Sequence, residues 1–250
     1  MLKKDKILKK LKNKTNLIIL NKTDSTNNYA KQNADTDLPL VIIAKKQTGG
    51  RGRLGRSFVS KKGGLYLSYV TSSFGNSFNA GLITACAAEA VATAIDEICG
   101  INCGIKWVND IYINGKKVCG ILTEGCFSNK EIPDKIIIGI GVNIEKNFAT
   151  KEIKDIATYL KRECEAKVDI NLLAASIINH LEYNLLNIDN LSFIENYRKK
   201  SIITDKEITV IQNDEKFSAT ALRIEDDCSL TVLINGTERN INFGEISIKV

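Results

Sequence analysis

The residues best suited to chemistry in this chain form a glycine- and arginine-rich loop at residues 47–56. Within it, Gly50-Arg51-Gly52-Arg53-Leu54-Gly55-Arg56 places three guanidinium groups among glycines. Glycine lets the backbone approach a ligand closely, and consecutive backbone N–H groups can hold an anion. Arginine adds planar, permanently charged donors that suit phosphate or carboxylate. The loop is therefore predicted to close over a phosphate-bearing ligand, although a solvated basic loop or a non-specific nucleic-acid patch has a similar composition.

The spacing of this loop separates it from two common phosphate-binding motifs. No Gly-Lys-Ser/Thr follows the glycines, as a P-loop requires, and the next segment has the pattern of a strand rather than a helix. The apolar run at residues 40–44 predicts a buried strand before the loop, and residues 65–70 alternate like a second strand after it. The loop is therefore expected to connect two strands and to be a motif of its own.

A second set of polar residues interrupts two apolar segments that a predicted hairpin joins. The turn is Asn114-Gly115, and across it Asn109 and Asp110 face Lys117 and Gly120. A carboxylate is a hard oxygen ligand for Mg²⁺, and a lysine ammonium can stabilise charge that develops in a transition state. These residues indicate a site for an anion and a magnesium ion, while a turn aspartate and an exposed strand lysine are the simpler alternative for each residue taken singly.

A third candidate is the segment Asp24-Ser25-Thr26-Asn27, which precedes a short helical pattern at residues 28–31. Ser, Thr and Asp are common at helix N-caps, so capping alone can explain these residues. Hydroxyl and backbone N–H groups at a helix start can also bind the polar edge of a ligand. Both interpretations predict a helix that begins here.

The remaining segments predict the elements that must position these groups. Helices are expected at residues 2–13, 80–99, 152–163 and 170–200, and further strands at residues 17–20, 105–113, 116–124 and 135–140. His180, the single histidine, lies on the last of these helices without a partner nearby in sequence and is predicted to be structural. After Lys200 the composition changes, and residues 206–250 alternate between apolar and polar side chains with short turns, which predicts a small β-barrel.

Composition places the chain among globular proteins and limits the classes of partner that we expect. Of its 250 residues, 44% are hydrophobic and 26% are charged, which allows a full core. The net charge of +6 suits anionic substrates, but we take the lysines to be dispersed, so the support for nucleic-acid binding is weak. No segment is apolar and long enough to span a membrane, and no signal peptide is recognisable.

The cysteines indicate neither a zinc site nor a disulfide framework. There are seven of them with one histidine and no C-x-x-C pair, and only Cys99 and Cys103 come near the spacing of zinc ligands. They are scattered through apolar segments. We therefore expect unpaired core cysteines in a protein of the reducing cytoplasm.

Taken in order, the motifs of this chain resemble those of the biotin protein ligases. Seven blocks carry the resemblance: residues 24–27, Gln47 with 50–56, 64–68, 106–110, 117–122, 139–143 and 244–247. They span about residues 17–250, nearly the whole chain, in the order and with the spacing of the family. A lone Gly-Arg-Gly-Arg is a weak signal, whereas seven ordered blocks are specific.

The chain departs from the family pattern in three places. Val108 stands where the family usually has proline, which should alter backbone stiffness more than chemistry. Lys249 stands where an arginine is common, which puts a bidentate phosphate contact in doubt. The N-terminal DNA-binding domain of the bifunctional members is missing, so a monofunctional ligase without a specific DNA partner is expected.

The resemblance implies an α+β fold, with a mixed β-sheet flanked by helices as in the catalytic domains of class II aminoacyl-tRNA synthetases. Residues 1–203 would form the catalytic, biotin- and ATP-binding ligase domain, and residues 204–250 a small SH3-like β-barrel. The protein would be cytoplasmic, without a membrane partner, and either a monomer or a homodimer.

The implied reaction has two steps and three small-molecule or metal participants, namely biotin, ATP and Mg²⁺. The biotin carboxylate attacks the α-phosphorus of ATP, which gives biotinyl-5′-AMP and pyrophosphate. A lysine of a biotin carboxyl carrier protein, such as the carrier subunit of acetyl-CoA carboxylase, then attacks the mixed anhydride and releases AMP. Because the anhydride must be kept from water, the 47–56 loop is predicted to order when ligand binds.

The resemblance also assigns site residues. Lys117, Arg51 and Arg53 would be catalytic, and Asp110 would hold Mg²⁺. Contacts with biotin would come from Ser25, Thr26, Asn27, Gln47, Gly50, Arg51, Gly52, Arg53, Tyr66, Lys117, Gly120, Gly139 and Gly141. Contacts with ATP or the adenylate would come from Arg51, Arg53, Arg56, Trp107, Asn109, Asn143 and Lys249.

Two rival functions come from different classes. A lipoate–protein ligase would have the same fold, but its signature blocks differ from Gly-Arg-Gly-Arg and Lys-Trp-x-Asn-Asp. A non-catalytic biotin sensor or nucleic-acid-binding module would need a reading helix or a concentrated basic face, and the sequence indicates neither.

Overall fold

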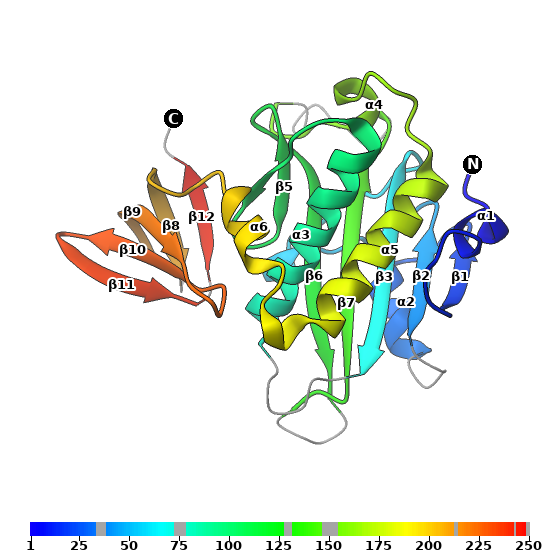
Figure 1. Ribbon diagram of the computed structural model, residues 1–250, viewed down its shortest axis with the longest axis horizontal. Coiled ribbons are helices and arrows are strands. Elements are labelled where there is room, and N and C mark those ends of the chain that lie inside the picture. Colours follow the sequence, from blue (N-terminus) through cyan, green and yellow to red (C-terminus); the bar gives the residue numbers. More distant parts are fainter. Residues whose placement is uncertain are drawn as a thin grey trace.

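The computed structural model describes residues 1–33, 39–72, 79–127, 132–146, 155–212, 215–242 and 244–248. Its larger part is built on a seven-stranded sheet (Figure 1) with the spatial order β1-β2-β3-β7-β6-β5-β4. The strands are β1 (Asn16–Leu20), β2 (Leu40–Ala44), β3 (Gly64–Ser72), β4 (Gly104–Lys106), β5 (Asp110–Ile113), β6 (Lys116–Cys126) and β7 (Lys135–Asn143). Only β1 and β2 pair in parallel, and the other neighbours are antiparallel, so the predicted mixed sheet is confirmed.

Helices cover both faces of this sheet. The described helices are α1 (Lys4–Leu8), α2 (Thr26–Gln32), α3 (Ala80–Cys99), α4 (Leu160–Glu163), α5 (Ile170–Leu186) and α6 (Ile194–Lys199). Figure 1 shows α3 and α5 side by side in front of the sheet and α2 behind it. The ends of α3 follow from local chemistry, because the Asn79 side chain accepts from the Leu82 N–H at 3.0 Å and Gly100 takes the left-handed conformation (φ +65°) after its last residue.

The apolar core has two parts, one on each face of the sheet. Side chains that alternate along β2 divide between them: Val41 and Ile43 join the core under α3 and α5, whereas Leu40 and Ile42 pack with Ala30 of α2. Every residue of β2 is buried, as its continuous apolar run predicts. The strand that precedes the glycine–arginine loop is therefore fixed from both sides.

Three predicted helices are shorter than their sequence patterns. The helix expected at residues 170–200 is broken into α5, a 3₁₀ turn at Ile188–Asn190, and α6, because Leu191 adopts a positive φ of 51° between them. Of residues 2–13 only Lys4–Leu8 is helical, since the Asn179 side chain binds the Lys10 carbonyl and the Lys12 N–H beyond it. In the described part of 152–163, only Leu160–Glu163 is helical.

The C-terminal strands form a second, five-stranded sheet in which all neighbours are antiparallel. Its spatial order is β11-β10-β9-β8-β12. The strands are β8 (Glu207–Gln212), β9 (Glu215–Ile224), β10 (Leu230–Ile234), β11 (Thr237–Ile241) and β12 (Glu245–Ile248). The second antiparallel sheet is thus confirmed, and within the described residues β11 and β12 do not pair, so closure of the predicted small barrel is not observed there. The domain boundary at residues 203–204 stays a prediction.

The cysteine prediction is wrong at two positions. Cys99, at the end of α3, and Cys164, directly after α4, form a disulfide that joins positions 65 residues apart. The sequence could not indicate this pairing, because it depends on how the segment after α4 returns to α3. The other five cysteines are free, and all but Cys126 are buried, as expected of core residues.

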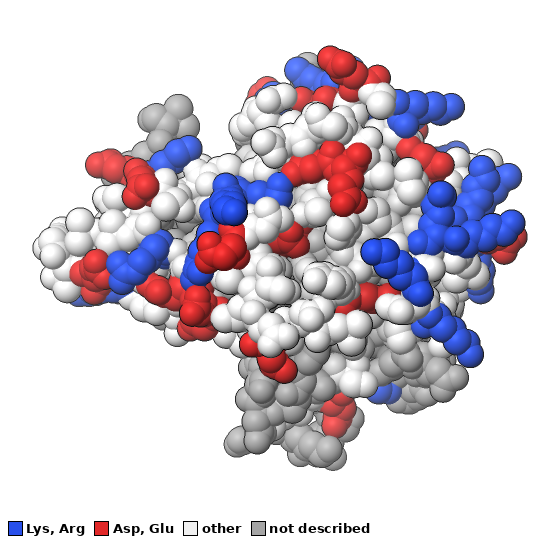
Figure 2. Space-filling model, viewed as in Figure 1, with Lys and Arg blue, Asp and Glu red and all other residues white. Residues whose placement is uncertain are grey.

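The positive charge is concentrated rather than dispersed. Residues 1–14 contain seven lysines and one aspartate, a local charge of +6 that equals the net charge of the whole chain. All seven lysines are exposed, and Figure 2 shows basic side chains gathered over the N-terminal segment. Among the described residues, no helix is long and apolar enough to cross a membrane.

Candidate active site

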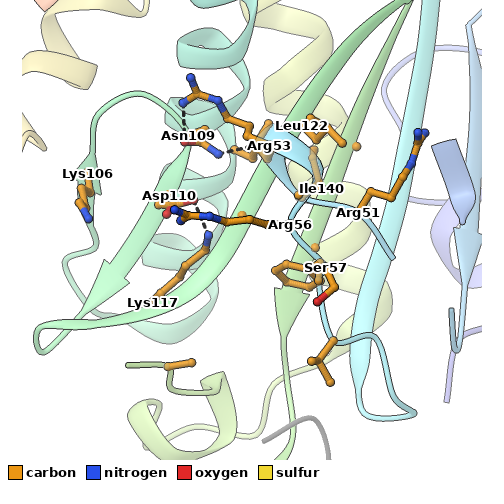
Figure 3. Close-up of a pocket in the computed structure, with 18 of the residues that line it drawn as sticks. Arg51, Arg53, Arg56, Ser57, Lys106, Asn109, Asp110, Lys117, Leu122 and Ile140 are labelled. Atoms are coloured by element: carbon orange, nitrogen blue, oxygen red, sulfur yellow. Dashed lines mark hydrogen bonds and ion pairs between the residues drawn. The ribbon is translucent and has the colours of Figure 1, made fainter. Parts of the chain in front are cut away.

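A cavity of about 410 Å³ lies between the two sheets, and most of the residues singled out in the sequence line it. The start of α2, the loop after β2, the β4–β6 region, β7 and residues 156–157 contribute to its wall. The C-terminal sheet completes the wall with Ile211, Glu245, Ile246 and Ser247. The cavity therefore needs both parts of the molecule, and Figure 3 shows cationic side chains from several elements around it.

Each arginine of the glycine–arginine loop is held by a different part of the protein. The Arg53 guanidinium donates to Asn109 Oδ1 at 3.1 Å and to the Gly244 carbonyl at 3.0 Å. Arg56 pairs with Glu245 of β12, and Arg51 pairs with Glu124 of β6 at 3.0 Å. Burial lowers the pKa of Arg53, although the charges of Asp110 and Glu245 oppose that shift. The loop is thus tied to both sheets through its charged side chains.

Lys117 and Asp110 meet across the predicted hairpin. Asp110 pairs in register with Gly120, and Lys117 Nζ lies 2.6 Å from Asp110 Oδ1. That oxygen is buried and has no aligned hydrogen-bond partner in the described structure, so the contact is an ion pair of close distance but poor hydrogen-bond geometry. The backbone of Lys117 is fixed separately, because its N–H donates to the Ile156 carbonyl at 3.0 Å. β6 therefore holds the Lys117 ammonium group beside the cavity.

The start of α2 is capped by a side chain from the glycine–arginine loop. Gln47 Oε1 accepts from the Thr26 backbone N–H at 2.7 Å and from the Thr26 hydroxyl at 3.0 Å, while Gln47 Nε2 donates to Ser60 at 2.8 Å. Ser25 is the N-cap residue but its side chain makes no capping hydrogen bond. Simple capping by Ser25 therefore does not explain this segment, and Ser25, Thr26 and Asn27 all line the cavity.

Glycines of β6 and β7 make room for the side chains that reach the cavity. A Cβ atom on Gly139 would lie 2.4 Å from Asn27 Oδ1, and one on Gly141 would lie 2.6 Å from the Phe58 ring. A Cβ on Gly120 would lie 3.0 Å from Lys117 Nζ. Any larger residue at the first two positions would displace a side chain that lines the cavity.

The structure brings most predicted site residues to this cavity, but not all of them. Tyr66 is buried away from the lining, where its hydroxyl donates to the Lys61 carbonyl at 2.6 Å. Gly50 packs tightly on the Phe58 carbonyl and Ser60 and does not line the cavity either. Lys249 lies outside the described residues.

Three further predicted residues do line the cavity. Trp107 also donates from Nε1 to the Cys228 carbonyl at 2.8 Å, so it joins the two sheets, and its peptide bond to Val108 is cis. Asn143 donates to the Thr158 carbonyl at 3.1 Å, while its buried Oδ1 lacks a partner in the described structure. Gly52 lies in the lining as well.

Sequence reasoning missed several residues at or beside the site: Phe58, Lys106, Tyr112, Glu124 and Glu245. Lys106 faces Asp110 in the β4–β5 pair, and its Nζ lies 5.7 Å from the Tyr112 ring centre. Burial is the main cause that lowers the pKa of Lys106. A lysine inside an apolar strand pattern was the signal that could have identified it.

Comparison with known proteins agrees with the family resemblance of the sequence motifs. The Biotin/lipoate A/B protein ligase family model matches residues 19–143. The chain is 38% identical over 162 residues to the bifunctional ligase/repressor BirA of Bacillus subtilis, an alignment that covers 63% of this chain and 48% of that protein. It is 36% identical over 129 residues to a biotin–[acetyl-CoA-carboxylase] ligase of Paracoccus denitrificans, covering 50% of this chain and 53% of that one. The chain thus spans about half the length of these curated relatives.

A solved structure extends the likeness to the whole fold. The biotin protein ligase of Aquifex aeolicus in complex with biotin and ATP superposes with a TM-score of 0.82 at 30% identity, covering 94% of this chain and 98% of that one. The match includes the C-terminal part that the family model leaves out. Together with the family model, it shows that the chain belongs to the biotin/lipoate A/B protein ligase family.

Proposed function

We propose that this protein joins biotin to ATP to form biotinyl-5′-AMP and then transfers the biotinyl group to a lysine of a biotin carboxyl carrier protein. The observation that carries the proposal is the convergence of Lys117 and the three loop arginines on one cavity that both sheets complete. The proposal is also supported by the structural similarity to the Aquifex aeolicus ligase, whose structure contains biotin and ATP.

In the first step, a biotin carboxylate oxygen attacks the α-phosphorus of ATP, and the bond to the bridging oxygen of pyrophosphate breaks. A carboxylate and a triphosphate repel each other, so the site must supply positive charge and alignment. Lys117 would leave Asp110 to neutralise charge between the two substrates, and Arg51 and Arg53 would turn from their protein partners to the anions.

In the second step, the amine of the carrier lysine attacks the carbonyl carbon of the anhydride, and AMP leaves with the electrons of the broken C–O bond. The amine loses its proton as the amide forms. Water would compete with the lysine, so the 47–56 loop must cover the anhydride. We propose that ligand anions replace the protein partners of Arg51, Arg53 and Arg56 and order the loop over the site.

The residues present fit a magnesium ion in part. No group of three or more potential metal-binding side chains occurs among the residues that the structure describes. Mg²⁺, however, is commonly held by one or two carboxylates, substrate phosphates and water, and Asp110 has a buried oxygen without a hydrogen bond. Asp110 would therefore hold the ion together with ATP, and the ion would neutralise charge on the phosphates.

Two assays test the proposal. Pyrophosphate release should require both biotin and ATP, and labelled biotin should then appear on a purified carrier domain in a manner that needs its acceptor lysine. Lipoate offered in place of biotin distinguishes the other substrate of the family model. Pyrophosphate release with lipoate and not with biotin would overturn the proposal.

A further inference from the structure

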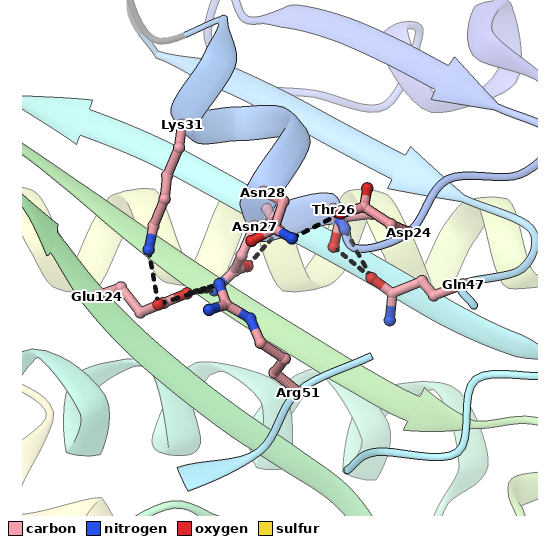
Figure 4. A network of polar contacts seen from close by, with 9 residues as sticks. Asp24, Thr26, Asn27, Asn28, Lys31, Gln47, Arg51 and Glu124 are labelled. Atoms are coloured by element: carbon pink, nitrogen blue, oxygen red, sulfur yellow. Dashed lines mark hydrogen bonds and ion pairs between the residues drawn. The ribbon is translucent and has the colours of Figure 1, made fainter. Parts of the chain in front are cut away.

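Glu124 of β6 lies outside the cavity lining, yet it contacts two side chains that belong to the lining (Figure 4). Its carboxylate accepts from Asn27 Nδ2 at 2.7 Å and from Arg51 Nη2 at 3.0 Å. Lys31, one turn after Asn27 on α2, binds the other carboxylate oxygen at 2.8 Å. Glu124 thus connects the start of α2 with the glycine–arginine loop.

The contact with Asn27 decides which way its side-chain amide points. Asn27 is 4% exposed, and its Oδ1 accepts from the Ser68 hydroxyl at 2.6 Å. A hydroxyl can donate or accept, so Ser68 alone would tolerate the amide in either orientation. An ionised carboxylate only accepts, so Glu124 requires the NH₂ group on its side and leaves the amide oxygen toward Ser68.

The groups around Glu124 favour its ionised form, which is the form that orients the Asn27 amide. Burial alone would raise the pKa of Glu124, but hydrogen bonds from Lys31 and Asn27 and the charges of Lys31 and Arg51 outweigh it and lower the pKa. Glu124 is therefore an anion at neutral pH. With Lys31 on one side, it can keep one cationic partner when Arg51 moves.

We infer that Glu124 is a positioning residue of the proposed biotin site, whose carboxylate orients the Asn27 amide and holds Arg51 next to it. The inference rests on the proposed function. It predicts an effect on biotin affinity that passes through Asn27 and Arg51, because Glu124 itself does not line the cavity. ATP affinity should change little, because Arg53, Arg56 and Lys117 supply cations for the phosphates through contacts that do not involve Glu124.

The test is calorimetric binding of biotin and of ATP to the full chain with two substitutions. Glu124→Met removes the charge and both acceptors, and we expect biotin to bind roughly tenfold more weakly, with ATP affinity unchanged within about twofold. Glu124→Gln keeps one acceptor for Asn27 but neither the charge nor the orientation preference, so it should fall between Met and wild type. Glu97→Gln, which removes a carboxylate that pairs with His180 instead, is the matched control and should bind biotin normally.

A double-mutant cycle separates positioning from a general structural role. If Glu124 acts through the amide, Glu124→Met should weaken biotin binding much less in an Asn27→Ala background than in wild type. Equal biotin affinity of wild type and Glu124→Met overturns the positioning role alone. Equal losses of biotin and ATP affinity with a lower melting temperature also overturn it, since they mark a purely structural residue. Wild-type protein that binds no biotin overturns the proposed function and this inference with it.

Discussion

Four of the cations that line the cavity have acceptors of their own in the described structure. Lys117 pairs with Asp110, Arg51 with Glu124, Arg56 with Glu245, and Arg53 with an amide and a carbonyl oxygen. A ligand anion therefore has to exchange partners with the protein instead of meeting bare charges. Such an exchange favours ligands that supply several anionic oxygens at once, as a carboxylate and a triphosphate do together.

The first prediction concerns Lys117. Lys117→Met keeps most of the side-chain volume but removes the ammonium, so formation of biotinyl-AMP should slow by about 10²–10³-fold. Single-turnover release of pyrophosphate measures it. Lys116→Met, on the same strand but outside the cavity lining, is the matched control and should retain the wild-type rate. A Lys117→Met enzyme with the wild-type rate would refute the assignment.

The second prediction concerns the glycine beneath Phe58. In Gly141→Ala the new methyl would lie 2.6 Å from the Phe58 ring, so the ring must shift within the cavity wall. Overpacking of this kind costs about 1–3 kcal/mol, and we expect biotin to bind about tenfold more weakly. Calorimetry measures the affinity.

A control on the same strand separates binding from stability. Ile138 is fully buried in β7 and does not line the cavity, so Ile138→Val should lower stability by about 1 kcal/mol without changing biotin affinity. Gly141→Ala protein with normal biotin affinity would show that Phe58 moves without consequence for the site.

Sequence reasoning identified the charged residues of the site better than the residues that support them. Motif resemblance and hairpin pairing brought Lys117, Asp110 and the arginines together in advance. Glu124 escaped notice because its partners, Asn27 and Arg51, are distant in sequence and meet it only when β6 passes the start of α2. Tyr66 was expected at the ligand, but its ring is buried edge-on against Phe58 and its hydroxyl donates to the Lys61 carbonyl.

At the scale of elements, residues 155–164 form a strap that closes one side of the cavity. The strap pairs with the beginning of β6, because the Lys117 N–H donates to the Ile156 carbonyl at 3.0 Å and the Thr158 N–H donates to the Lys117 carbonyl at 2.9 Å. Ile156 and Ala157 line the cavity, and Cys164 at the far end bonds to Cys99. The disulfide therefore anchors the segment that holds the backbone of Lys117.

The third prediction follows from that anchor. The disulfide joins residues 65 apart, and closing a loop of this size in the unfolded chain stabilises the folded state by about 2–4 kcal/mol. A dithiol reductant should therefore lower the melting temperature by several degrees, at about 2–4 °C per kcal/mol for a chain of this length. The Cys99→Ser/Cys164→Ser double variant should melt at the reduced temperature with or without reductant.

Thiol titration checks the same point chemically. Unfolded protein that has not been reduced should present the five free cysteines, and reduced protein all seven. Seven reactive thiols before reduction, or a melting temperature that reductant leaves unchanged, would contradict the disulfide.

Most elements were predictable because their local patterns are strong. The buried run of β2 and the Asn-Gly turn between β5 and β6 needed no tertiary information. The break between α5 and α6 did, because an apolar stripe continues across Leu191 while its backbone does not. The N-terminal helix was also overestimated, since the Asn179 side chain of α5 binds the backbone that should have continued it.

At the scale of the molecule, the two sheets are joined at the site. Trp107 binds the Cys228 carbonyl, and Arg53 bridges Asn109 and the Gly244 carbonyl. Arg198 of α6 adds a hydrogen bond of 2.8 Å from its Nε to the Ile224 carbonyl of β9. The sequence predicted a C-terminal domain at residues 204–250 and expected Lys249 of that domain to contact ATP. The structure adds Ile211, Glu245, Ile246 and Ser247 to the cavity wall, which only the packing of distant segments could reveal.

The net charge of the whole molecule comes from its N-terminal segment, because residues 15–250 are neutral overall. The basic N-terminal segment is fixed in place by Ile7, which is fully buried, and by hydrogen bonds with α5, such as the one that the Lys3 N–H donates to Asn171 Oδ1 at 2.7 Å. Its lysines point outward and none lines the cavity. The charge of the molecule can therefore be changed without touching the site.

The fourth prediction uses this separation. Replacing the seven lysines by glutamine takes the formal net charge from +6 to −1, and the variant should elute from a cation exchanger at much lower salt. The positions are Lys3, Lys4, Lys6, Lys9, Lys10, Lys12 and Lys14. Biotin affinity should be unchanged because the cavity keeps its own cations. Ile7→Ser is the converse control: it keeps the charge, leaves a polar group in the core and should lower stability by about 2–4 kcal/mol. A charge variant that loses biotin binding would show that the basic segment acts on the site after all.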